Sequence, residues 1–234
     1  MKTKFPSLRC QSLRALLCGL SLTLVTSCGM SDQALPKVLD VDPYPGAWDM
    51  QKLTDKNADP NIVEVDLEAR VTEVEYLPGK KTPAWAYNGS VPGPLIEAKV
   101  GDRVLVHFKN SLPDATTIHW HGVRVPNNMD GHTLMMNPVP AGGSFDYSFQ
   151  VQDAGTFWYH PHVRSDSQVE KGLYGALVVR AASEPMLTSE RVVMLDDVYL
   201  DANGMPMPVG DMMELMIGRQ GNLLLANGKA RPTR

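Results

Sequence analysis

Cysteine is scarce in this sequence of 234 residues, and the few cysteines lie close to its N-terminus. They are Cys10, Cys18 and Cys28, so the sequence after residue 28 carries no thiol. This absence excludes an internal disulfide framework in the body of the chain, and it excludes a thiolate ligand from any metal site there. A metal ion in that part of the chain would need histidine, methionine, carboxylate or water ligands.

Long hydrophobic runs are missing as well. The apolar stretch from Ala15 to Val25 is too short to cross a bilayer as a helix, but it has the length of the apolar part of a secretion signal. The basic residues that precede it are Lys2, Lys4, Arg9 and Arg14. We therefore predict that residues 1–27 are a signal peptide and that the chain is exported.

The residues at the predicted cleavage point indicate how the exported chain is attached to the membrane. Val25-Thr26-Ser27-Cys28 resembles the lipobox of bacterial lipoproteins, in which cleavage occurs before the cysteine and the thiol carries lipid. The resemblance implies a lipid anchor at Cys28, a location in the bacterial periplasm or cell envelope, and attachment to the membrane through the lipid alone. The alternative is a plain secretion signal in which Cys28 has no such role.

The sequence also lacks an excess of positive charge. Its formal net charge is −4 at pH 7. The predicted signal peptide contains 4 of the 22 basic residues and none of the 26 acidic ones, so the mature chain would carry a net charge of −8. This balance argues against nucleic acid as a partner.

Alternation with a period of two is the dominant pattern of the body. It is clearest from Ile62 to Tyr76, where the apolar residues expected on one face are Val63, Val65, Leu67, Ala69 and Val71. Further strands are predicted at Leu95–Val100, Arg103–Asn110, Thr116–Trp120, Ser144–Val151, Thr156–His160, Leu173–Arg180, Arg191–Leu200 and Asn222–Ala226. Short strands with Gly and Pro turns, and no long stretch of helical period, predict an all-β sandwich with Greek-key connections.

Composition divides the chain into four segments. After the signal peptide, residues 28–60 are polar and punctuated by proline, which is typical of a tether or an irregular N-terminal arm. Residues 61–182 hold most of the predicted strands and form the first domain. Residues 183–234 are expected to contain a linker and the truncated beginning of a second domain, because they are too few for another complete sandwich.

Histidine is also rare, and four of the six histidines form two short pairs. One pair is His119 and His121, and the other is His160 and His162. On a strand, residues i and i+2 point to the same face, so each pair offers two imidazoles on one side. Two such strands side by side would direct four imidazoles at one small volume, and imidazole suits copper, zinc, iron and nickel. The pattern predicts a metal centre.

Several segments resemble the first cupredoxin domain of the multicopper oxidases, the family that includes laccases and cuprous oxidases. They are Asn88-Gly89-Ser90-Val91-Pro92-Gly93-Pro94, Val100-Gly101-Asp102, His119-Trp120-His121-Gly122, Phe157-Trp158-Tyr159-His160-Pro161-His162 and Gly172-Leu173-Tyr174-Gly175-Ala176-Leu177. Their order and spacing agree with the family over roughly residues 61–180. The resemblance implies a cupredoxin-like Greek-key β-sandwich.

The resemblance also implies roles for particular residues. His119 would bind the type 2 copper of a trinuclear cluster, and His121, His160 and His162 would bind the type 3 pair. Asp130 lies where the family has an acidic residue that helps to deliver protons to the reduced oxygen. A turn-forming Asp-Gly is the alternative interpretation of Asp130.

By the same resemblance, the reaction would reduce dioxygen to water while a phenol or a metal ion such as Cu(I), Fe(II) or Mn(II) is oxidised. The sequence departs from the family because it contains no His-Cys-His segment and so no type 1 copper ligands, and because it holds only half of the eight cluster histidines. We expect it to be the N-terminal portion of a multicopper oxidase, inactive alone. The remaining cupredoxin domains would be supplied in cis or in trans.

Three other functions are alternatives to the oxidase. A non-enzymatic copper-binding or copper-resistance module would also use convergent histidines and many methionines without a thiolate. A copper nitrite reductase shares the fold but has a cysteine where Pro161 follows His160 here. A zinc hydrolase lacks a candidate catalytic carboxylate near either pair.

The sequence also supports predictions for a few residues outside the two pairs. Alternation places His107 towards solvent, and His132 is expected to be a loop residue rather than a ligand. Trp120 and Trp158 are expected to pack in the sandwich or shield the site. Thioethers favour Cu(I), but methionine also fills irregular cores. The methionines considered for Cu(I) contact are Met129, Met135, Met136, Met194, Met205, Met207, Met212, Met213 and Met216.

Overall fold

The computed structural model describes residues 49–185, 187–207 and 218–230. The predicted signal peptide, the proposed lipidation residue Cys28, and the methionines Met212, Met213 and Met216 lie outside these ranges. Within the described residues, no helix is both long enough and apolar enough to span a membrane.

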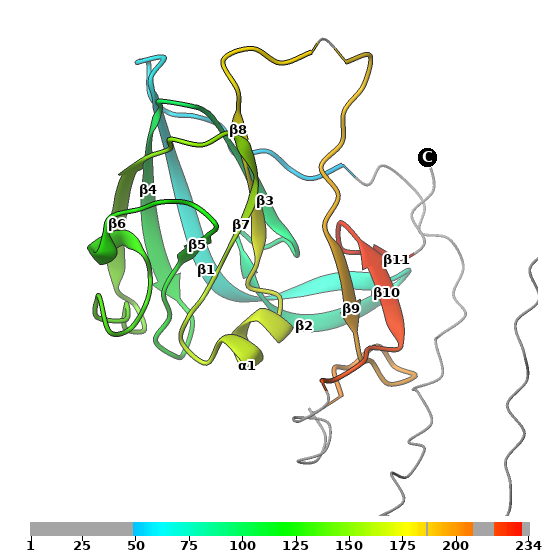
Figure 1. Cartoon of the computed structure of the whole chain (residues 1–234). Helices are drawn as coiled ribbons and strands as arrows, with labels where there is room; N and C mark the ends of the chain where they lie inside the picture. The colour runs from blue at the N-terminus through cyan, green and yellow to red at the C-terminus, as the bar shows by residue number, and fades with distance from the viewer. Residues whose placement is uncertain (1–48, 186, 208–217, 231–234) are drawn as a thin grey trace, which may run out of the picture. The chain divides into compact units, whose positions relative to one another are not determined.

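Two four-stranded sheets form a sandwich (Figure 1). The first sheet has the strand order β2-β1-β4-β6, with β1 at Ile62–Leu77, β2 at Lys80–Tyr87, β4 at Arg103–Ser111 and β6 at Ser144–Gln150. The second has the order β3-β8-β7-β5, with β3 at Gly93–Lys99, β8 at Gly175–Arg180, β7 at Gly155–His160 and β5 at His119–His121. The pairs β1/β4 and β3/β8 are parallel, so each sheet joins strands that are distant in the sequence. The predicted all-β Greek-key sandwich is confirmed.

The core lies between the two sheets because alternate residues of the strands are apolar and point inward. Val65, Leu67 and Ala69 of β1 are buried in the same cluster as Ile96 of β3. Val71 was expected on this inward face, but it is 54% exposed. The pairing of β1 with β4 ends one residue earlier, and beyond it β1 pairs only with β2, outside the main core.

Four local features differ from the sequence-based expectations. Strand β2 was not predicted, because its lysines and Pro83 do not resemble a strand; it lies at the edge of its sheet, where proline is tolerated. Strand β5 begins at His119 rather than at Thr116, which forms only an isolated bridge. Strand β9 is limited to Leu195–Val198. The helix α1, Ser165–Glu170, has six residues and is too short to show a helical period.

A small antiparallel sheet follows the sandwich, with the order β11-β10-β9. It adds β10 at Leu223–Ala226 and β11 at Lys229–Ala230 to β9. Its buried side chains form one cluster with residues of the sandwich. The members of this cluster are Tyr76, Leu77, Ala84, Ala86, Val91, Tyr174, Val198, Leu200, Leu223, Leu225 and Ala230.

Residues 51–53 of the predicted N-terminal arm lie along the edge strand β3. The backbone N–H of Leu53 donates to Leu95 O at 2.9 Å, and the side chain of Leu53 packs against the core. Lys52 forms an ion pair with Glu97 at 2.6 Å. This part of the arm therefore covers a sheet edge that would otherwise be open to pairing with other chains.

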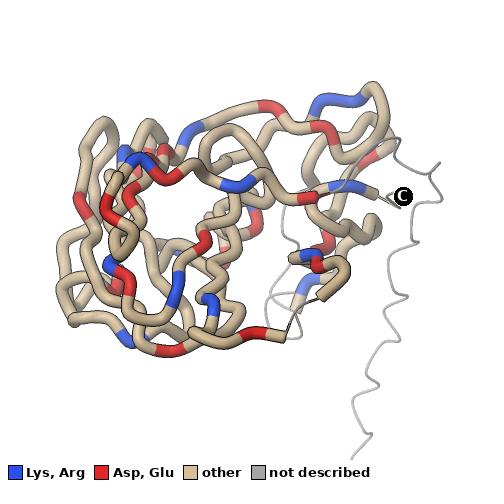
Figure 2. Tube along the Cα trace, turned by 90° about the horizontal axis from the view of Figure 1, so that it is seen from above, with Lys and Arg blue, Asp and Glu red and all other residues tan. Residues whose placement is uncertain are grey.

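Acidic and basic side chains are interspersed along the described chain (Figure 2). Neighbouring opposite charges form local ion pairs, such as Arg124 with Asp153 at 2.7 Å and Arg164 with Asp114 at 2.8 Å. His107 follows the same pattern, since its ring lies between Glu64 and Asp146, at 2.9 Å from each carboxylate. Its side chain is 37% exposed, in agreement with the predicted outward orientation.

The substitution His107→Gln should weaken the fold in a pH-dependent manner. Hydrogen bonds to Glu64 and Asp146 raise the pKa of His107 above its usual value. The stabilisation is therefore fully present below the unfolded pKa of about 6.5, and it is lost as the pH rises through the higher folded pKa. We expect a loss below about 1 kcal/mol at pH 5.5, because the group is exposed, and a smaller loss at pH 9.

Urea denaturation at the two pH values measures this difference. Lys109→Gln is the matched control, since Lys109 lies on the same strand and face as His107. Equal losses for His107→Gln at both pH values would contradict the ion-pair explanation.

Candidate metal centre

Three of the four paired histidines are carried by two neighbouring strands, and His162 follows the end of one of them. Strands β5 and β7 pair antiparallel, with His119 directly opposite His160 and His121 opposite Trp158. The intervening Trp120 points to the other face and is fully buried in the core. The alternation of the strands thus directs the imidazoles away from the core on the same side of the sheet.

The four imidazoles lie within a few ångströms of one another. The ring centroid of His119 is 5.5 Å from that of His121, 5.3 Å from that of His160 and 4.1 Å from that of His162. One nitrogen from each of His119, His121 and His160 lies within 4.8 Å of the others. The structure therefore brings together all four histidines of the predicted site.

Hydrogen bonds fix the orientation of two rings. His119 Nδ1 lies 2.8 Å from the carbonyl oxygen of Asp130, and His160 Nδ1 lies 3.0 Å from that of Pro161. A carbonyl oxygen can only accept, so each Nδ1 carries the proton and leaves the lone pair on Nε2. An imidazole held in one tautomer by its second nitrogen is the usual arrangement of a histidine metal ligand.

Burial keeps part of the cluster uncharged. His160 is 6% exposed, and its burial lowers the pKa of the imidazole to about 4, with the neighbouring histidines acting in the same direction. Burial is also the main cause of the lowered pKa of His162. Neutral imidazole is the form that binds metal ions. An all-nitrogen donor set of this kind fits copper, and it also fits zinc, iron or nickel.

Asp130 lies beside the cluster, at the place where the resemblance implies an acidic residue. Its carboxylate Oδ1 is 3.4 Å from His119 Nδ1, while its carbonyl oxygen accepts the shorter hydrogen bond. The next residue, Gly131, has φ +78°, and a Cβ there would lie 2.1 Å from Ile118 O. Only glycine allows this loop to lie so close to the strand that carries His119.

The sequence did not predict a ligand role for His132 or Trp158, yet both lie near the cluster. His132 lies in a loop, as predicted, but its ring centroid is 5.3 Å from that of His162. Trp158 stacks on His160 with centroids 4.0 Å apart, and it also lies 5.1 Å from His121. The expectation that Trp158 shields the site is consistent with this contact. The position of Trp158 opposite His121 could be obtained only from the strand register.

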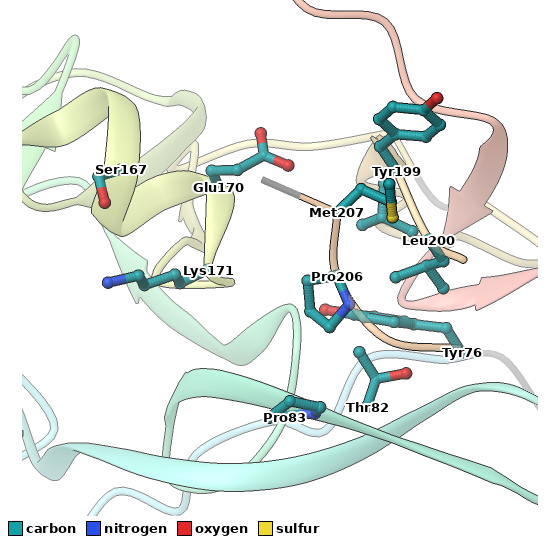
Figure 3. A pocket seen from close by; sticks show the side chains of 11 residues that line it. Tyr76, Thr82, Pro83, Ser167, Glu170, Lys171, Tyr199, Leu200, Pro206 and Met207 are labelled. Atoms are coloured by element: carbon teal, nitrogen blue, oxygen red, sulfur yellow. The ribbon is translucent and has the colours of Figure 1, made fainter. Parts of the chain in front are cut away.

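A cavity of about 380 Å³ lies elsewhere, between β2, α1 and the segment after β9 (Figure 3). Tyr76, Pro206 and Met207 contribute to its walls, and none of the six histidines does. Met205 and Met207 are partly exposed, at 45% and 42%. Their contact with Cu(I) stays a prediction.

Comparisons with known proteins agree with this fold. The multicopper oxidase family model matches residues 68–184. The chain is 46% identical over 124 residues to copper resistance protein A of Pseudomonas syringae pv. tomato, an alignment that covers 52% of this chain and 20% of that protein. It is 44% identical over 112 residues to the multicopper oxidase MmcO of Mycobacterium tuberculosis, covering 47% of this chain and 22% of that protein.

Among solved structures, a multicopper oxidase from Campylobacter jejuni, described as a metallo-oxidase, matches with a TM-score of 0.75 and 36% identity. The match covers 86% of this chain and 43% of that one. The sandwich is thus a cupredoxin fold. Since the family model covers half of the chain, the chain belongs to the multicopper oxidase family. It spans only about a fifth of the length of the two curated relatives.

Proposed function

We propose that this chain supplies half of the histidine ligands of a trinuclear copper cluster in an exported multicopper oxidase. His119 would bind the type 2 copper, and His121, His160 and His162 would bind the type 3 pair. The observation that carries the proposal is the convergence of nitrogens from His119, His121 and His160 within 4.8 Å of one another, on adjacent strands of a cupredoxin sandwich.

When bound, copper would supply one-electron redox chemistry and a place for dioxygen to bind. The protein would hold the Nε2 lone pairs of His119 and His160 towards the ions, through the carbonyl oxygens of Asp130 and Pro161. Trp158 would exclude water from one side of His160 by stacking on its ring. Asp130 would move protons towards the site from its position 3.4 Å from His119 Nδ1.

The other four histidines and the type 1 copper ligands would come from further cupredoxin domains, in cis or in trans. In this proposal residues 183–234 contain a linker and the start of the next domain. The small sheet formed by β9, β10 and β11 supports this division. The reducing substrate would be a phenol or an ion such as Cu(I), Fe(II) or Mn(II), bound by parts that this chain does not contain. Export with a lipid anchor at Cys28 completes the proposal.

A copper-binding module without oxidase activity is the second candidate. The match to a copper resistance protein and the all-histidine cluster both suit it. Membership of the multicopper oxidase family favours the oxidase over a zinc hydrolase.

Copper titration of the purified chain, followed by electron paramagnetic resonance and by oxygen uptake, tests the proposal. We expect Cu(II) to bind through nitrogen ligands, and we expect oxygen uptake only when a partner domain with the other four histidines is present. Binding without oxygen uptake in that reconstituted sample would favour the copper-binding module. A chain that binds no copper would refute both candidates.

A further inference from the structure

His162 differs from the other three histidines of the cluster in how its backbone is held. His119, His121 and His160 belong to paired strands, so the β5/β7 ladder fixes their positions. Strand β7 ends at His160, and Pro161 cannot donate a ladder hydrogen bond. The position of His162 must therefore depend on contacts outside the sheet.

Thr117 provides the nearest of these contacts. The backbone N–H of His162 donates to Thr117 Oγ1 at 3.0 Å, and Thr117 is fully buried. Thr117 lies two residues before His119. This hydrogen bond therefore ties the end of one histidine pair to the start of the other.

Gln168 of α1 forms a second link between the segment that follows His162 and the segment that precedes His119. Its side chain is fully buried, Oε1 accepts from Thr116 Oγ1 at 2.7 Å, and Nε2 donates to the carbonyl oxygen of Ala115 at 3.0 Å. Both polar atoms of the amide are thus used on the segment that leads into His119. A buried amide is costly unless it is paired in this way, so the contact fixes where α1 can lie.

The chain between His162 and Gln168 is short and constrained, so the helix can position the histidine. Arg164 adopts φ 41°, which is unusual for a residue other than glycine, and its backbone carbonyl accepts the N–H of Gln168 at 2.9 Å. The ion pair of Arg164 with Asp114 is solvent-exposed and contributes little. The buried hydrogen bonds of Gln168 and Thr117 are the contacts that decide the geometry.

We propose that Gln168 and Thr117 are positioning residues that hold the imidazole of His162 against that of His119 at the separation that copper binding requires. This inference rests on the proposed function for its copper readout. Neither residue would touch copper; each acts through the backbone of the segments that carry the ligands. Loss of such supporting contacts typically lowers metal affinity by about 10–100-fold.

The first test compares Gln168→Met with Asn222→Leu in the full chain. Both substitutions keep the approximate volume and remove a buried amide, and Asn222 makes its two side-chain hydrogen bonds to Leu200, next to the small sheet. The copper-free readout is the nuclear Overhauser effect between the rings of His119 and His162, whose centroids are 4.1 Å apart. We expect this signal to fall in Gln168→Met and to persist in Asn222→Leu.

The second test compares Thr117→Val with Thr117→Ser. Valine has the shape of threonine without the acceptor, whereas serine keeps the oxygen. We expect a copper Kd about 10–100-fold higher for Thr117→Val, and recovery of most of the wild-type affinity in Thr117→Ser.

The two readouts separate the inference from the function on which it rests. If the wild-type chain binds no copper, the proposed function fails, while the ring-to-ring signal still decides whether Gln168 positions His162. An unchanged signal in Gln168→Met, or an unchanged Kd in a folded Thr117→Val, would overturn the positioning role.

Discussion

Replacing His160 by alanine should lower the affinity of the chain for copper by at least about 100-fold, since losing a ligand costs more than losing a supporting contact. His160 is the most buried of the four imidazoles, and its Nδ1–H is already committed to Pro161 O. Its Nε2 lies 3.3 Å from His121 Nδ1, so the substitution removes one of the nitrogens that converge there. Isothermal titration with Cu(II) measures the change.

A histidine outside the cluster supplies the control for that experiment. Both ring nitrogens of His107 are hydrogen-bonded to carboxylates. His107→Ala should therefore leave the copper affinity within about twofold. A similar loss in both variants would show that copper binds non-specifically to surface histidines. Retention of wild-type affinity in His160→Ala would remove the basis of the proposed centre.

Replacing Trp120 by alanine should cost about 3–5 kcal/mol of the free energy of unfolding. The indole is fully buried, with ring centroids 5.5 Å from Tyr147, 4.8 Å from Phe149 and 5.9 Å from Tyr159. Alanine would leave a cavity between the sheets, directly behind the strand that carries His119 and His121. Since the total stability of a domain is about 5–15 kcal/mol, the loss is large.

Urea denaturation of Trp120→Ala and Trp158→Ala distinguishes the two tryptophans. Trp158 is only partly buried and stacks on His160, so its removal should cost less stability while changing the copper spectrum. A loss below about 1 kcal/mol for Trp120→Ala would mean that the core closes around the missing ring.

Much of this molecule follows from local patterns that act along a single strand. Alternation predicted β1, β4 and β6 nearly to the residue, because a strand with one buried face must repeat every two residues. The spacing of His119 and His121 placed both imidazoles on one face of β5 for the same reason, whereas His162 lies beyond the end of β7. The elements β2, β9 and α1 were missed or given wrong ends, since their positions depend on neighbours rather than on a period.

The sequence by itself determined the all-β class, the absence of thiolate ligands after residue 28, and the strand face that carries His119 and His121. Only the tertiary structure decided that His119 lies opposite His160, that Trp158 stacks on His160, and that Gln168 reaches the segment before His119. Strand register and long-range hydrogen bonds set these contacts. They join residues about forty to fifty positions apart, over distances that no local repeat in the sequence encodes.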